Sequence, residues 1–358
     1  MDPALLDVIK VFVPAVFAFT TGIVVTPFLT HFLYKHRAWK KSAGKVDLEG
    51  KEALVFNELH KNKETNTPRM GGIIIWASVF IAIFVLWILG MLYEGSIFEK
   101  LNFLSRNQTW VPLILLGAGS LIGLADDFLE IQTQAGFSKG LSLRVRLLSV
   151  GILALGAGWW FFDKLDVTAI GIPFNAPLEI GWLIVPLFVL TVLFFYASGV
   201  IDGIDGLAGG VFAIIFGAYA GIAFFQNQID LAAFAATIAG GILAFLWFNI
   251  PPARFYMSET GTMGLTITLA TIAFMTDTLG EGHGFLTLGI IALPLSGTVL
   301  SNIIQVASKK WFGKKVFRVA PLHHHFEALG WPAYKVTMRY WVLTAVLAFA
   351  GVAFALLG

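Results

Sequence analysis

Ten long apolar stretches constrain this chain more than any other feature. Each approaches or exceeds the roughly 20 residues that a helix needs to cross a bilayer. Only 13% of the 358 residues are charged, against about 25% in an average soluble domain, so polar side chains cannot cover the apolar mass. We therefore predict an all-α polytopic membrane protein with one domain, residues 1–358, embedded in the lipid bilayer. The expected spans are 11–34, 71–92, 111–128, 146–162, 183–201, 207–225, 232–250, 263–279, 285–307 and 339–357.

Composition excludes several other classes of protein. The sequence contains no cysteine, which rules out disulfides, thiolate metal sites and cysteine nucleophiles. The formal net charge is only +2, so nothing indicates nucleic-acid binding. A soluble globule, a disordered chain and a disulfide-stapled secreted domain do not fit such a sequence.

The positions of Lys and Arg predict the orientation of the spans. With the N-terminus outside, twenty of the 24 basic residues fall on or at the edge of inside segments, and cytoplasmic segments carry an excess of Lys and Arg. We therefore expect both termini outside. The outside segment 163–182 has a weak strand–turn–strand pattern, which predicts a short external β-hairpin.

Polar clusters interrupt the apolar pattern at four places, and this orientation puts all of them on the cytoplasmic side. Two adjacent acids end the third span, and two more acids three residues apart join the fifth and sixth spans. A single glutamate precedes the eighth span and three consecutive histidines precede the tenth. These residues are Asp126, Asp127, Asp202, Asp205, Glu259, His323, His324 and His325.

The acids have a structural and a functional interpretation. Asp202 and Asp205 precede a helix, where a carboxylate can cap free N–H groups. Asp126 and Asp127 instead end a helix, where the dipole disfavours negative charge, so something must offset their cost, and a bound cation is the simplest candidate. Adjacent residues on a helix point about 100° apart, so these two carboxylates cannot aim at one atom. All-oxygen ligands favour Mg²⁺ or Mn²⁺ over zinc.

The basic and histidine segments carry weaker signals. Three consecutive histidines lack the spacing of a helical zinc site. They indicate a contact to an anion or nucleotide, with a solvated polar loop as the alternative. Lys61 and Lys63 lead to Gly71-Gly72 at the inner start of the second span. A glycine pair at a helix start suits an anion, although single lysines there also fit ordinary positive-inside charge.

Together these motifs resemble the phospho-N-acetylmuramoyl-pentapeptide transferase family, within the polyprenyl-phosphate N-acetylhexosamine-1-phosphate transferases. The resemblance covers about residues 60–339, and the triple-histidine string is its most specific part. The matching strings are Thr67-Pro68-Arg69-Met70-Gly71-Gly72, Asp126-Asp127, Asp202-Gly203-Ile204-Asp205-Gly206-Leu207, Phe245-Leu246-Trp247-Phe248-Asn249 and Ala320-Pro321-Leu322-His323-His324-His325-Phe326-Glu327.

The resemblance implies a reaction and its location. Undecaprenyl phosphate attacks the β-phosphate of UDP-MurNAc-pentapeptide, giving undecaprenyl-diphospho-MurNAc-pentapeptide (lipid I) and UMP, with Mg²⁺ required. This is a step of peptidoglycan synthesis in the bacterial inner membrane, with ten spans, outside termini and the active site on the cytoplasmic face. A homodimer is among the open oligomeric states.

The resemblance also implies roles for individual residues. Asp126 activates the lipid phosphate or, alternatively, attacks through a covalent intermediate. Asp127 and Asp205 act near the metal and the diphosphate, with Glu259 and Asp127 as metal ligands. The residues expected at the substrates are His324 as a catalytic group, and Lys61, Lys63, Asp202, Asn249, His323 and His325 as binding groups.

Four positions depart from the family pattern. Glu259 stands where the family usually has the metal-binding aspartate, and its extra methylene displaces the carboxylate by about 1.5 Å. Tyr196 and Gly199 replace two asparagines, and Glu130 replaces a lysine. Two alternatives remain: a relative that uses UDP-GlcNAc, against which the histidine string argues, and a non-catalytic lipid-binding or transport paralogue. Transporters usually carry intramembrane charges near the midplane, whereas these lie at one edge.

Overall fold

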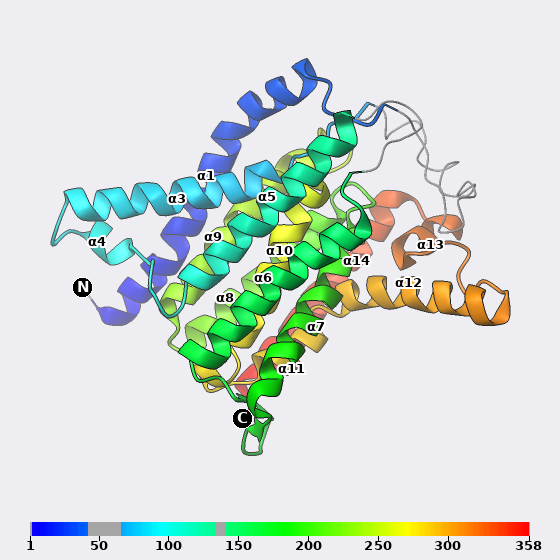
Figure 1. Cartoon of the computed structure of the whole chain (residues 1–358). Coiled ribbons are helices and arrows are strands. Elements are labelled where there is room, and N and C mark those ends of the chain that lie inside the picture. Colours follow the sequence, from blue (N-terminus) through cyan, green and yellow to red (C-terminus); the bar gives the residue numbers. More distant parts are fainter. Residues whose placement is uncertain (1, 42–65, 133–139, 358) are drawn as a thin grey trace.

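The computed structural model describes residues 2–41, 66–132 and 140–357, and over these residues the chain is a bundle of helices (Figure 1). The predicted binding residues Lys61 and Lys63 lie outside the described part. The long helices are α1 (Pro3–Lys35), α3 (Ile73–Leu92), α5 (Trp110–Gln132), α6 (Leu143–Lys164), α7 (Ile184–Tyr196), α8 (Leu207–Phe225), α9 (Ile229–Asn249), α10 (Ser258–Met275), α12 (Leu293–Phe312) and α14 (Ala333–Leu356). Shorter elements are α4 (Ile97–Leu101), α11 (Gly284–Ile291), α13 (Leu322–Ala328), and the 3₁₀ turns η1 (Gly181–Leu183), η2 (Ala197–Ile201) and η3 (Thr278–Gly280).

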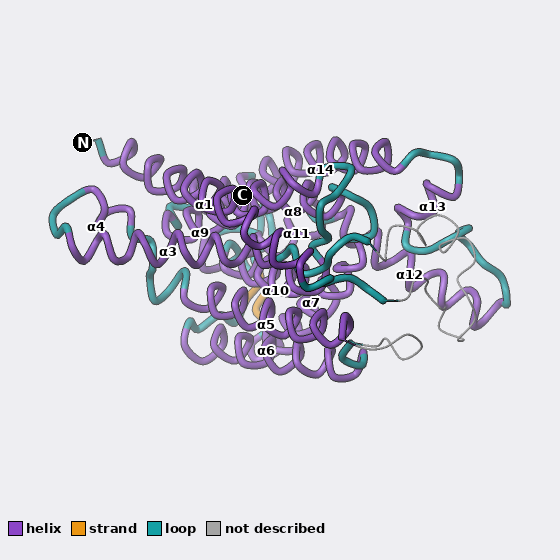
Figure 2. The backbone as a smooth tube through the Cα atoms, turned by 90° about the horizontal axis from the view of Figure 1, so that it is seen from above, coloured by secondary structure: helices purple, strands orange, loops and turns teal. Residues whose placement is uncertain are grey.

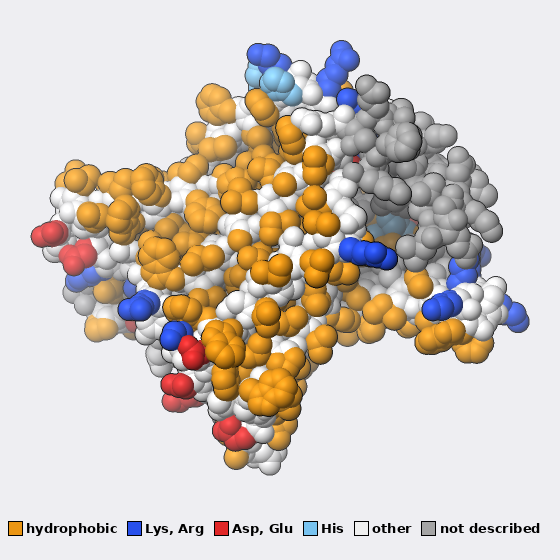
Figure 3. Space-filling model, viewed as in Figure 1, with side chains coloured by type: hydrophobic (Ala, Val, Ile, Leu, Met, Phe, Trp, Pro, Cys, Tyr) orange, Lys and Arg blue, Asp and Glu red, His pale blue; other side chains and the backbone are white. Residues whose placement is uncertain are grey.

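The predicted all-α membrane fold is confirmed. In the described ranges, eight helices are individually long and apolar enough to cross a membrane, and the bent pair α11 and α12 makes a ninth. The remaining predicted span, 263–279, corresponds to α10, whose Thr, Ser, Gly and Glu content makes it less apolar than the others. Figure 3 shows hydrophobic side chains over the middle of the visible face, with most charged side chains toward its edges, as expected for a lipid-facing belt.

Helix α10 occupies the centre of the bundle (Figures 1 and 2). It packs against α5, α7 and α11, and all of its residues except Glu259 are buried. Three of its buried hydroxyls are satisfied within the helix, because Thr262, Thr266 and Thr271 donate to carbonyls of the preceding turn. A helix covered by protein on all sides does not need a continuous apolar surface, which explains its weaker hydropathy.

Two features distinguish the ends of the spans. The predicted hairpin within 163–182 is confirmed as antiparallel strands β1 (Ala169–Ile170) and β2 (Leu178–Glu179), with Ala169 opposite Glu179. The predicted span 285–307 is instead broken, and α11 and α12 meet at 71°. Pro294 stands in the first turn of α12, where a proline needs no hydrogen-bonding N–H, and the bend that precedes it was not part of the prediction. Figure 1 shows α12 leaving the body of the bundle sideways.

Candidate active site

The site forms where α5 and α10 come into close contact. A Cβ placed on Gly123 of α5 would lie 2.0 Å from the carbonyl oxygen of Glu259. Only glycine therefore fits at this position, and the two backbones touch. One helical turn further along α5, Asp126 and Asp127 reach the start of α10, so this contact is what brings the paired acids to Glu259.

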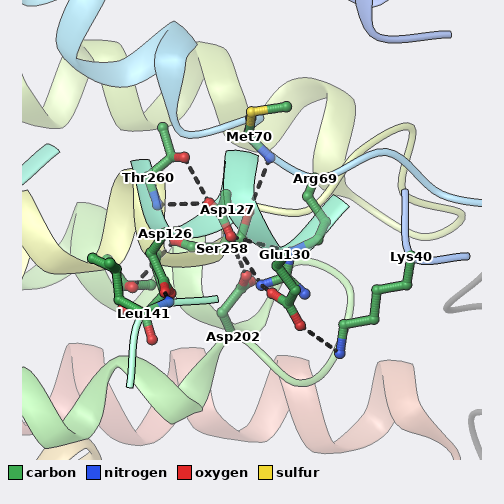
Figure 4. Close-up of polar contacts among 12 residues, drawn as sticks. Lys40, Arg69, Met70, Asp126, Asp127, Glu130, Leu141, Asp202, Ser258 and Thr260 are labelled. Atoms are coloured by element: carbon green, nitrogen blue, oxygen red, sulfur yellow. Dashed lines mark hydrogen bonds and ion pairs between the residues drawn. The ribbon is translucent and has the colours of Figure 1, made fainter. Parts of the chain in front are cut away.

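Asp127 is fully buried and held by four donors. Its Oδ2 accepts from the backbone N–H of Thr260 at 2.9 Å and from the Thr260 hydroxyl at 2.6 Å. Its Oδ1 accepts from Arg69 Nε at 3.1 Å and Arg69 Nη2 at 3.0 Å. Figure 4 shows this carboxylate at the middle of the polar network. An N–H at the start of α10 and a guanidinium thus stabilise the buried charge.

Asp126 faces a different set of partners, as the 100° separation of neighbouring helical residues predicts. Its carboxylate accepts from the backbone N–H of Leu141 and lies 3.4 Å from Arg146 Nη1. The same nitrogen of Arg146 is 2.8 Å from Glu259 Oε1. Arg146, near the start of α6, therefore bridges acids of α5 and α10.

Two arginines neutralise the buried charges of the paired acids Asp126 and Asp127. The sequence predicts a bound cation as their compensation; it gives Arg146 only as a positive-inside charge and Arg69 only as such a charge and as one residue of the Thr67–Gly72 string. The structure instead puts one guanidinium on each acid, Arg69 on Asp127 and Arg146 on Asp126. Pairing of this kind reduces the cost of burying a carboxylate, and sequence reasoning missed both residues as parts of the site.

The Asp-Gly-x-Asp-Gly segment lies beside the same helix start. Asp202 Oδ2 accepts from the backbone N–H of Ser258 at 2.7 Å, and Asp205 Oδ2 accepts from the N–H of Ala253 at 3.3 Å. Burial raises the pKa of Asp202 to about 6, although the Ser258 N–H and the charge of Arg69 oppose the rise. Asp202 therefore gains a proton as the pH falls through about 6 and is mainly ionised at neutral pH.

Asn249 connects this segment to the loop before α10. Its Oδ1 accepts from the N–H of Gly206 at 2.9 Å, and its Nδ2 donates to the carbonyl of Phe255 at 2.8 Å. The side chain is almost completely buried. In this arrangement both ends of the amide hold backbone, so Asn249 fixes the turn that carries Asp202 and Asp205.

Replacing Asn249 with alanine is expected to destabilise the protein. The N–H of Gly206 and the carbonyl of Phe255 would both be left buried without a hydrogen-bond partner. The free energy of unfolding is expected to fall by about 2–4 kcal/mol in total. Thermal unfolding in detergent measures the loss, with the exposed Asn107 changed to alanine as the matched control. An Asn249→Ala protein that melts with the control would contradict this structural role.

The glycine pair at the start of α3 is not an open anion site. The N–H groups of Gly71 and Gly72 donate to the carbonyls of Tyr256 at 2.8 Å and Met257 at 3.2 Å. A Cβ on Gly72 would lie 2.3 Å from the backbone nitrogen of Gly261. The expectation of an anion at this pair was therefore wrong, because the backbone before and within α10 occupies the space.

The histidine segment forms α13 and packs beside Asp202. A Cβ on Gly203 would be 2.7 Å from the Nε2 atoms of both His323 and His324, so the glycine allows this contact. His324 Nδ1 lies 2.7 Å from Glu327 Oε2. A proton held between these two atoms leaves Nε2 as the nitrogen directed at the Gly203 backbone. His325 has a different partner, because its Nδ1 accepts from the N–H of Arg318 at 3.1 Å.

The acids of the site only partly match the ligand set that a divalent metal needs. In the described residues no three His, Asp or Glu side chains form a ready-made ligand set. However, Glu259 Oε2 is buried and has no hydrogen-bond partner among those residues. Mg²⁺ uses one or two carboxylates and completes its shell with water and substrate phosphate, so this free oxygen fits a first ligand. Asp127 would have to release Arg69 or Thr260 to become a second.

Comparisons with known proteins identify the family. A profile of glycosyl transferase family 4 matches residues 109–277, the segment from α5 to the end of α10. The phospho-N-acetylmuramoyl-pentapeptide-transferase of Caldanaerobacter subterraneus is 31% identical over 95% of this chain and 97% of its own length. The chain belongs to the phospho-N-acetylmuramoyl-pentapeptide-transferase family. Proteins of the same name from Shouchella clausii and Bacillus anthracis are each 33% identical over 94% of this chain, which covers 95% and 94% of their lengths.

Membership in the phospho-N-acetylmuramoyl-pentapeptide-transferase family makes the chain a multi-pass membrane enzyme. The predicted resemblance is thereby confirmed over nearly the whole sequence. Three of the four departures from the family pattern lie inside the network around Arg69 and Arg146. Glu259 contacts Arg146, Tyr196 faces the same guanidinium, and Glu130 contacts Arg69.

Proposed function

We propose that this chain transfers phospho-MurNAc-pentapeptide from UDP-MurNAc-pentapeptide to undecaprenyl phosphate. An oxygen of the lipid phosphate attacks the β-phosphorus, the bond from that phosphorus to the bridging oxygen breaks, and UMP leaves with the bridging oxygen. The products are undecaprenyl-diphospho-MurNAc-pentapeptide and UMP. The proposal places the site on the cytoplasmic face of the bacterial inner membrane, where a lipid phosphate and a soluble nucleotide can meet.

The observation that supports this most is the convergence of Asp127, Asp202 and Glu259 at the start of α10. Two backbone N–H groups in this turn, those of Ser258 and Thr260, donate to Asp202 and Asp127. Acids from three distant segments therefore meet at one end of the bundle. That arrangement suits a hard divalent ion and a diphosphate, and it lies at one end of the bundle rather than at its middle.

The chain's own residues have distinct proposed roles. Asp126 would orient or deprotonate the lipid phosphate, which needs little base assistance because it is largely ionised at neutral pH. A covalent route through Asp126 remains the alternative. His324 and His325 would donate hydrogen bonds to phosphate or sugar. Asp202 and Asn249 would border the nucleotide, with Asn249 acting through the turn that it fixes.

A divalent ion, proposed to be Mg²⁺, would be held by Glu259 and, after release of one donor, by Asp127. When bound, it supplies positive charge that stabilises the diphosphate as charge develops on the leaving UMP. Arg146 keeps one oxygen of Glu259 engaged and leaves the other free, so the carboxylate is oriented before the ion arrives.

A direct assay tests the function. The purified protein in detergent, with undecaprenyl phosphate and Mg²⁺, is expected to release UMP from UDP-MurNAc-pentapeptide and to lose this activity with EDTA. UDP-GlcNAc is expected to support at most a small fraction of that rate. Preference for UDP-GlcNAc would favour the related GlcNAc-1-phosphate transferase, and release of UMP from neither nucleotide would favour a non-catalytic paralogue.

A further inference from the structure

Arg69 lies among three acids of the site but comes from the loop before α3. It donates two hydrogen bonds to Asp127 Oδ1, and its Nη2 is 2.9 Å from Glu130 Oε2. It is also close enough to Asp202 for their charges to attract. Figure 4 shows its guanidinium between the carboxylates of Asp127 and Glu130. No other described basic side chain contacts Asp127.

A row of alternating charges extends outward from Asp127. Behind Arg69, Glu130 uses its second oxygen to bind Lys40 Nζ at 3.1 Å. All four side chains are largely buried: Asp127 is 0% exposed, Arg69 19%, Glu130 17% and Lys40 13%. Salt screens the attraction between partly buried charges much less than that between exposed charges. The position of the Arg69 guanidinium is therefore fixed from both sides.

Arg69 controls one particular oxygen of Asp127. Thr260 takes Oδ2 with two hydrogen bonds from the start of α10, whereas both hydrogen bonds to Oδ1 come from Arg69. Removing the guanidinium would leave Oδ1 buried without a donor and free the carboxylate to rotate about its Thr260 contacts.

The identity of residue 130 supports a special role for Arg69. Position 130 follows Asp127 by three residues on α5, so both side chains lie on the same helix face. A basic residue at 130 could reach Asp127 directly. In this chain the residue is an acid, and the positive charge comes instead from position 69 on a separate segment.

We propose that Arg69 is a positioning residue of the transfer site, held in place by Glu130 and Lys40, and that it sets the orientation of the Asp127 carboxylate. This inference rests on the proposed function. It goes beyond it by assigning a task to Arg69 together with Glu130, the acid that stands where the family usually has a lysine.

A charge exchange tests the proposal. Arg69→Gln is expected to lower kcat for UMP release by about tenfold or more with little change in KM for the nucleotide, because substrate binding does not require the Asp127 orientation. Arg69→Lys should retain part of kcat. Combining Arg69→Gln with Glu130→Lys puts a cation beside Asp127 from α5 and is expected to recover about tenfold over Arg69→Gln alone. Lys41→Gln, an exposed neighbour of Lys40, is the control and should match wild type.

Melting temperatures of the same proteins separate positioning from simple loss of fold. The proposal is overturned if the double variant is folded but no more active than Arg69→Gln, or if the loss in Arg69→Gln matches the fraction of unfolded protein. A wild-type protein that releases no UMP would overturn the proposed function and this inference together. Activity in wild type without rescue in the double variant would overturn this inference alone.

Discussion

Asp127→Asn is expected to abolish UMP release from UDP-MurNAc-pentapeptide, with a loss of about 100-fold or more. Asparagine has one acceptor oxygen where aspartate has two. Its amide nitrogen must therefore face either the two donors of Arg69 or the two donors of Thr260. The negative charge near the diphosphate site is lost at the same time, and of its two ion pairs Arg69 keeps the one with Glu130.

The control is Asp163→Asn at the C-terminal end of α6, where the carboxylate is 41% exposed and pairs only with its neighbour Lys164 among the described residues. This variant should keep wild-type activity and melting temperature. Near-full activity in Asp127→Asn would remove Asp127 from the catalytic site. A folded Asp127→Asn protein without activity is the result that the geometry predicts.

The rate of UMP release is expected to depend more on the charge of residue 259 than on the length of its side chain. Glu259→Asp should retain measurable activity, because the carboxylate moves by only about 1.5 Å and can still face Arg146. Glu259→Gln should be inactive, because it keeps the length but loses the charge that binds Arg146 and that would hold a divalent ion. The measurement is the rate of UMP release as a function of Mg²⁺ concentration.

The two Glu259 variants should also differ in their response to the metal. Glu259→Asp is expected to require more Mg²⁺ for half-maximal rate than wild type, and Glu259→Gln should not recover at any concentration. Glu281→Gln, an exposed glutamate in the α10–α11 loop, is the matched control. Equal activities of Glu259→Asp and Glu259→Gln would show that Glu259 binds no metal.

Much of the fold was predictable because hydropathy over about 20 residues is a strong signal. The hairpin was predictable too, from a turn-rich segment between apolar stretches. The bend between α11 and α12 was not predicted, because a proline within an apolar run does not by itself mark a break: Pro14 and Pro27 lie inside the continuous helix α1. Lys and Arg placement predicts which side of the membrane the termini occupy, and this orientation stays a prediction.

The acidic residues of the site could be predicted from the sequence, whereas the arginines that pair with them could not. Asp126, Asp127, Asp202 and Glu259 interrupt apolar sequence, and charge there is costly enough to require a reason. Arg69 and Arg146 carry no comparable signal, because a basic residue near the inner end of a span has the same sequence context whether it marks orientation or pairs with an acid. The glycines at 71 and 72 show a similar ambiguity, since close packing and anion binding both need a residue without Cβ.

The central claim is that one phosphorus atom moves from a nucleotide to a lipid at the cluster around Asp127. It is tested most directly with UDP-MurNAc-pentapeptide carrying ³²P only in the β-phosphate, incubated with the purified protein, undecaprenyl phosphate and Mg²⁺. The account predicts that the label passes into the butanol-extractable lipid, in equal amount to unlabelled UMP, and that Asp127→Asn transfers none. Label that stays in water-soluble products while UMP is released, or equal transfer by Asp127→Asn, would contradict it.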